Sequence, residues 1–122
     1  METESAVYIK DGHLPNGEPV DFIGAILDGV KTGETRRHNR LARGWVGMAK
    51  GGLVYGRVRL GAPHVIRRGE PEYYGAMIQG TEYDIAPGGT AYYYPVLCIE
   101  DFRSNPKPII LSGHYAKYQK GV

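Results

Sequence analysis

The stretch Gly29-Val-Lys-Thr-Gly-Glu-Thr-Arg36 decides where this chain turns from a helix into a strand. It follows an apolar segment whose large side chains recur at helical spacing: Phe22, Ile23, Ile26, Leu27 and Val30. Asp21 is a suitable N-cap for that segment, and the glycine at position 29 suits a helix end. The pattern predicts a helix of about ten residues, followed by an extended segment over residues 33–37.

Three charged side chains in this stretch are expected to converge. Residues two apart on a strand point to the same face, so Glu34 and Arg36 share one face of the predicted strand. Lys31 approaches the same place from the end of the helix. We predict that Lys31, Glu34 and Arg36 line one small pocket suited to an anionic, hydrogen-bonding ligand.

The trio allows two kinds of functional site and one structural role. In a binding site, Arg36 offers a planar fork to a phosphate or a base edge, Lys31 adds a point charge, and Glu34 accepts from an exocyclic amine. In a catalytic site, Lys31 acts as a base once burial or neighbouring cations lower its pKa, and Arg36 stabilises developing negative charge. In the structural role, Glu34 pairs with Lys31 or Arg36 only to fix the loop.

Length and composition favour one small domain built from short elements. The chain has 122 residues, with 18 glycines and 8 prolines that favour turns over long helices. Its single cysteine, Cys98, allows no internal disulfide, and its four histidines lack metal-ligand spacing. No apolar run is long enough to span a bilayer. We therefore expect a cytoplasmic protein with no membrane segment, metal or cofactor.

Charge is unevenly distributed along the chain. Residues 31–68 contain ten Lys and Arg side chains against a single acid, Glu34, although the formal net charge of the chain is only +2. This asymmetry favours a basic face for phosphates. The alternative is that strand alternation sends these cations to opposite faces, so that no patch forms.

The rest of the chain is predicted to be mostly β. Trp45–Ala49 and Leu53–Leu60 flank Lys50-Gly-Gly52, which indicates a hairpin. Residues 91–101 indicate a long strand in which Pro95 marks an edge or a bulge. We divide the chain into a turn-rich lead-in, residues 1–19 with a possible strand at Ala6–Ile9, and a domain over residues 20–122.

Read with the strands that follow it, the opening stretch resembles the ASCH domain family of the PUA-like superfamily. The resemblance rests on Gly29-x-Lys-Thr-x-Glu-x-Arg36, on Gly44-Trp45, on Leu53-Val-Tyr-Gly-Arg-Val58, and on Pro106-Lys-Pro108 followed by Gly113-His114. It implies an α+β fold: a small PUA-like β-barrel of about five to six strands with one or two short flanking helices.

The resemblance also implies a function. The family is described mainly as RNA-interacting, and some members are ribonucleases or amidohydrolases acting on N4-acylated cytidine nucleosides. Lys31, Glu34 and Arg36 match the motif lysine, acid and arginine. In the amidohydrolase branch a threonine stands at the position of Glu34, which counts against that activity here. That branch also uses a distant glutamate, for which Glu70, Glu72 and Glu82 are all candidates.

Our preferred hypothesis is a module that binds single-stranded or modified RNA, with ribonuclease activity as an option. The alternatives are an amidohydrolase on N4-acylated cytidine-type nucleosides and a protein-interaction adaptor. If the protein is an enzyme, Lys31 and Glu34 are the candidate catalytic residues. The tyrosines of the second half include candidates for base stacking, although most are expected to pack in the core. The full set of candidate ligand-binding residues is Lys31, Thr32, Glu34, Arg36, Arg37, Tyr55 and Tyr93.

Overall fold

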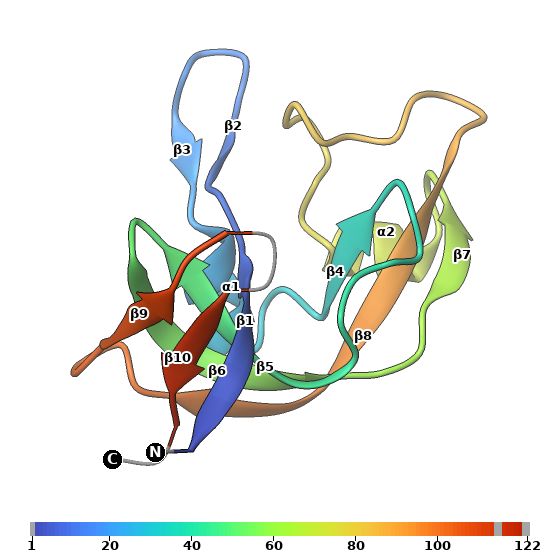
Figure 1. The fold of residues 1–122 in the computed structure, drawn as a ribbon. Coiled ribbons are helices and arrows are strands. Elements are labelled where there is room, and N and C mark those ends of the chain that lie inside the picture. The colour runs from blue at the N-terminus through green and yellow to red at the C-terminus, as the bar shows by residue number, and fades with distance from the viewer. Residues whose placement is uncertain (1, 114–115, 121–122) are drawn as a thin grey trace.

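The computed structural model describes residues 2–113 and 116–120, so His114, which belongs to the resemblance, lies outside the described residues. Within the described ranges the chain is mostly β, with two short helices (Figure 1). The elements in chain order are β1 (Thr3–Tyr8), β2 (Gly12–His13), β3 (Pro19–Val20), α1 (Phe22–Leu27), β4 (Gly33–Arg36), β5 (Gly44–Lys50), β6 (Leu53–Leu60), β7 (His64–Arg67), α2 (Pro71–Gly75), β8 (Thr90–Asp101), β9 (Lys107–Leu111) and β10 (Lys117–Gln119).

The described strands form a mixed eight-stranded sheet and a separate two-stranded hairpin, β2–β3. The path of the main sheet is β4-β8-β6-β5-β1-β10-β9, and β7 adds to β8. All its pairings are antiparallel except β1 with β5. Because β9 also pairs with β6, the strands β1, β5, β6, β9 and β10 form a partial ring.

Helix α1 is shorter than the sequence pattern predicts. Asp21 is its N-cap, as predicted, and its carboxylate accepts from the Gly24 amide at 3.0 Å. The helix ends at Leu27 because Gly29 has a φ of 76°, a left-handed conformation that stops the helix. Val30, predicted to lie on the apolar face, is therefore exposed.

The predicted hairpin of β5 and β6 is confirmed, and both turn glycines have positive φ values, 62° at Gly51 and 86° at Gly52. The predicted N-terminal strand is also present, although it starts earlier, as β1 between β5 and β10. Strand β10 lies in the tyrosine-rich tail, where no strand was expected.

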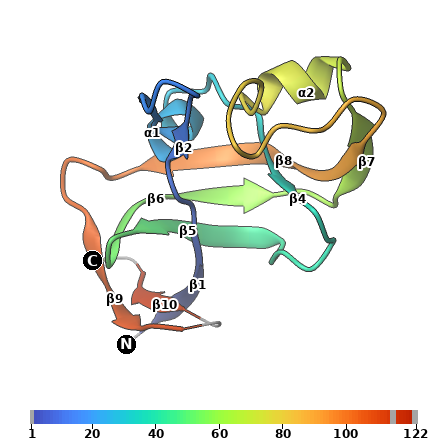
Figure 2. The same cartoon turned by 90° about the horizontal axis from the view of Figure 1, so that it is seen from above.

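Strand β8 connects the two parts of the sheet. Its first half pairs with β4 on one edge and β7 on the other, and its second half pairs with β6. The register shifts between β6 and β8 next to Leu60, close to the bulge or edge expected at Pro95. Both helices lie on the same side of β8 (Figure 2). The main core gathers α1, β5, β6 and β8, and it includes Tyr93 and Tyr94.

Candidate functional site

Four separate segments surround a cavity of about 180 Å³. Residues 8–10 at the end of β1 form one wall, and Phe22 of α1 forms another. Lys31 and β4 contribute the charged trio, and Ile78 and Tyr83 come from the loop after α2. Strand β4 stands at one end of the strand order, so this cavity lies at an edge of the sheet.

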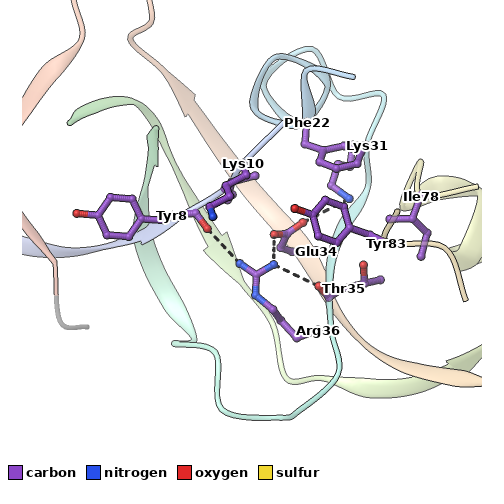
Figure 3. A pocket seen from close by; sticks show the side chains of 10 residues that line it. Tyr8, Lys10, Phe22, Lys31, Glu34, Thr35, Arg36, Ile78 and Tyr83 are labelled. Carbon is purple, nitrogen blue, oxygen red and sulfur yellow. Dashed lines mark hydrogen bonds and ion pairs between the residues drawn. The ribbon is translucent and has the colours of Figure 1, made fainter. Parts of the chain in front are cut away.

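The structure brings Lys31, Glu34 and Arg36 together at this cavity. The carboxylate of Glu34 lies between the two cations, with Oε1 at 3.4 Å from Lys31 Nζ and Oε2 at 2.6 Å from an Arg36 guanidinium nitrogen (Figure 3). Both Lys31 and Glu34 are buried, at 1% and 4% exposure. The ion pairs expected of the structural role therefore form, yet the trio still lines an open cavity.

Besides its ion pair with Glu34, Lys31 is held in place by two further contacts. Its ammonium donates to the Ala76 carbonyl at 2.5 Å and lies 4.6 Å from the centre of the Phe22 ring. Burial lowers the pKa of Lys31 below its usual range and Arg36 adds to this effect, whereas the neighbouring Glu34 carboxylate opposes it. The lysine is thus closer to its neutral form than a surface lysine.

The acceptor for Lys31 depends on an unusual backbone conformation. Ala76 caps α2, and the next residue, Met77, has a φ of 58°. A non-glycine residue in this region is strained by about 1 kcal/mol or more. Met77 lies between Ala76, whose carbonyl accepts from Lys31, and Ile78, which lines the cavity.

Arg36 ties β4 to β1 across the cavity. Its guanidinium donates to Glu34, to the Thr35 carbonyl at 3.3 Å and to the Tyr8 carbonyl at 3.3 Å. The ring of Tyr8 points away from the trio, so β1 presents its backbone to Arg36 (Figure 3). Arg36 keeps 27% of its side chain exposed, which leaves part of the guanidinium available to a ligand.

The loop that carries Tyr83 is fixed at two points. Asp84 accepts from the buried Tyr73 hydroxyl and, at 2.9 Å, from the Gly80 amide. Burial and then Asp84 raise the pKa of Tyr73 to about 12, so this hydroxyl stays a donor. On the other side, Glu82 accepts from the His13 amide at 2.8 Å. These contacts place the half-exposed Tyr83 ring 6.1 Å from Phe22, measured between ring centres.

None of the other four predicted ligand-binding residues lines this cavity, and three of them lie away from it. Thr32 and Tyr93 hydrogen-bond to each other through their hydroxyls at 2.6 Å, and the Tyr93 ring is buried. Tyr55 lines a different cavity together with Lys50 and Arg103. Their predicted ligand contacts stay predictions, without support from this geometry.

Arg37 lies close by, in a neighbouring cavity that also includes Thr35, Arg36 and Tyr83. The three candidate acids are elsewhere. Glu70 accepts from the Arg67 amide at 2.7 Å, Glu72 lies 3.7 Å from His64, and Glu82 is engaged with His13. None of them lines the cavity, and Glu82 is only adjacent in sequence to a residue that does.

Sequence reasoning missed two residues at the cavity. Lys10 adds a cation from the segment just after β1, and Tyr83 supplies an exposed aromatic ring. The sequence pattern held no signal for Lys10, because its position depends on the parallel pairing of β1 with β5. Tyr83 was among the tyrosines considered for stacking, and nothing in its own segment distinguished it from the others.

The comparisons with known proteins add no relationship. The sequence matches no profile of a known protein family, and no curated protein or solved structure is significantly similar to it. The resemblance to the ASCH family therefore stays a hypothesis. Within the described residues, neither helix is long and apolar enough to cross a membrane.

Proposed function

We propose that this cavity binds one base of a single-stranded or modified RNA. The observation that carries the proposal is the buried Glu34 carboxylate, fixed between Lys31 and Arg36 and lining a cavity beside exposed Tyr83. A carboxylate accepts from the exocyclic amine of a cytosine-type base. Within the described residues, Oε1 of Glu34 has one partner, at a long 3.4 Å, and so keeps acceptor capacity for such an amine.

The size and the walls of the cavity suit one small ring. Pockets for drug-sized ligands typically measure about 300–1,000 Å³, whereas this one has about 180 Å³. Tyr83 and Phe22 provide aromatic surface on which an unstacked base packs, a common mode of single-strand recognition. As part of the same proposal, the partial ring of β1, β5, β6, β9 and β10 is a PUA-like barrel, and the protein acts in the cytoplasm.

Binding to a panel of nucleosides and short RNAs tests the proposal. Tyr83→Leu removes the exposed ring and is expected to weaken binding by about fivefold to 150-fold, in line with about 1–3 kcal/mol per stacked base. Tyr74→Leu is the matched control, because Tyr74 is similarly exposed, at 55% against 46%, and does not line the cavity. Equal affinity of the two variants, both checked for folding by circular dichroism, would refute the proposal.

One observation favours the amidohydrolase alternative. The lowered pKa of Lys31 is the property that a lysine base needs near neutral pH. Incubation with N4-acetylcytidine tests this directly, with released cytidine as the product to be measured. No release by the wild-type protein across pH 6–9 would remove the hydrolase. Absence of binding to every nucleoside and RNA in the panel would favour the adaptor, with the ion pairs serving only the fold.

A further inference from the structure

Two further cavities share Arg36 with the base-sized cavity as a lining residue. One, of about 290 Å³, shares Thr35, Arg36 and Tyr83 with it. The other, of about 420 Å³, shares Tyr8 and Arg36 with it. Tyr8 lies on one side of Arg36, and Thr35 and Tyr83 lie on the other (Figure 3). The base cavity therefore shares residues with one flanking cavity on one side of Arg36 and with the second on the other side.

Each flanking cavity has its own cation. Arg37 lines the cavity on the Tyr83 side, and Arg40 lines the cavity on the Tyr8 side. His38 lines both of them. Within the described residues, neither flanking cavity is lined by an aspartate or a glutamate. Electrostatically, both cavities suit an anion.

The cations that these cavities add to the trio have no acidic partner among the ion pairs of the described residues. Ion pairs among the described residues engage Lys31, Arg36 and five further Lys or Arg side chains, but not Lys10, Arg37 or Arg40. Those three all line the base cavity or one of its two neighbours. Among the described residues, Glu34 is the only acid that lines the base cavity, and it is buried and paired with two cations. The unpaired cations around this cavity therefore present a positive potential to solvent.

We propose that the site reads an internal nucleotide of an RNA single strand, with one phosphodiester in each flanking cavity. This inference rests on the proposed function and adds the substrate class, a strand of at least three nucleotides instead of a free nucleoside or a strand end. The base enters the central cavity. Arg37 contacts the phosphate on one side of that nucleotide and Arg40 contacts the phosphate on the other.

A ladder of probes tests the inference: cytidine, the dinucleotides ApC and CpA, and the trinucleotide ApCpA, measured by calorimetry at low salt. If the nucleoside panel selects another base, it replaces C in each probe. Each added phosphodiester is expected to tighten binding by up to about fivefold, the value of an exposed ion pair. Arg37→Gln is expected to abolish the gain for one dinucleotide, and Arg40→Gln the gain for the other.

The double variant gives a second readout. With both arginines replaced, the dependence of ApCpA affinity on salt concentration is expected to fall by about 1.4 in log–log slope, or about 0.7 per phosphate. Arg59→Gln with Arg67→Gln is the matched control, because these arginines also lack an ion pair within the described residues and line none of the three cavities.

Two results separate failure of this inference from failure of the proposed function. If cytidine binds and ApCpA binds no tighter, or if the double variant behaves like the control, the internal-nucleotide inference is wrong and base recognition stands. If neither cytidine nor any other nucleoside or trinucleotide binds to the wild-type protein, the proposed function fails, and this inference fails with it.

Discussion

Replacing Glu34 by glutamine tests whether the buried trio is a coupled unit. The carboxylate is 4% exposed and contacts both cations, and its loss leaves the Lys31 ammonium buried without a counter-charge. Removing one member of a buried ion pair typically costs about 3–5 kcal/mol. Arg36 is partly exposed, so water still solvates its charge after the substitution. We therefore expect the low end of this range, about 3 kcal/mol.

A variant that combines Glu34→Gln with Lys31→Met distinguishes electrostatic coupling between the two residues from simple loss of packing. Lys31→Met alone leaves the Ala76 carbonyl without its donor, which costs about 2 kcal/mol. With both changes there is no buried charge to compensate, so the total is expected to be about 3 kcal/mol instead of the additive 5. The coupling energy is then about 2 kcal/mol, within the range for residues in direct contact.

Urea denaturation measures the free energy of unfolding of the wild-type protein, the two single variants and the double variant, with the midpoint and slope fitted for each. Glu100→Gln is the control, because Glu100 also pairs with an arginine but keeps 59% of its side chain exposed. That variant is expected to lose less than about 0.5 kcal/mol. The reasoning is refuted if Glu34→Gln loses less than about 1 kcal/mol, or if the two single effects add.

Three further predictions concern other parts of the fold. Burial acts to raise the pKa of Glu4, but hydrogen bonds led by those from Arg57 hold this pKa below its usual value. The ionised carboxylate therefore stabilises the folded protein above about pH 4.5, and this stabilisation is lost as the pH falls through the folded pKa. Arg57→Gln is expected to flatten the unfolding free energy measured between pH 3 and pH 6, and an unchanged acid dependence would contradict this. Met77 packs against the main core, so Met77→Gly is compared with Met77→Ala, which also removes the side chain. The glycine variant is expected to be more stable in urea by about 1 kcal/mol, since only glycine relieves the strain of a φ of 58°, and equal stability of the two variants would count against that strain. Gly33→Ala places a Cβ 2.3 Å from the Tyr93 ring and is expected to cost about 1–3 kcal/mol, seen as a lower thermal midpoint; an unchanged midpoint would mean that the ring moves freely.

Local patterns in the sequence predicted the elements that hold the trio. The N-cap at Asp21, the helix end near Gly29 and the period-two spacing of Glu34 and Arg36 are all short-range features, and the structure has each of them. The same kind of signal predicted the hairpin of β5 and β6 and its glycine turn. These elements could be predicted because their formation depends on residues that are neighbours in the sequence.

The other walls of the cavity depend on distant contacts. Lys10 reaches the site because β1 pairs in parallel with β5, and Tyr83 reaches it because Asp84 and Glu82 anchor its loop. Neither the pairing of β1 with β5 nor the anchoring of the loop that carries Tyr83 leaves a periodic pattern in the local sequence. The burial of Tyr93 and Tyr94 has a similar origin, since packing of β8 between β4 and β7 decides which of the three consecutive tyrosines are buried.

The pairing of β1 with β10 has a consequence for synthesis of the protein. These strands come from opposite ends of the described chain, and β10 also pairs with β9, so the partial ring gains its last strand only when residues 117–119 are available. Pairings this far apart in sequence form slowly, because a long loop must close before any contact stabilises it. On the ribosome, β1 must therefore wait until residues 117–119 have emerged, and until then its edge facing β10 lacks this partner strand.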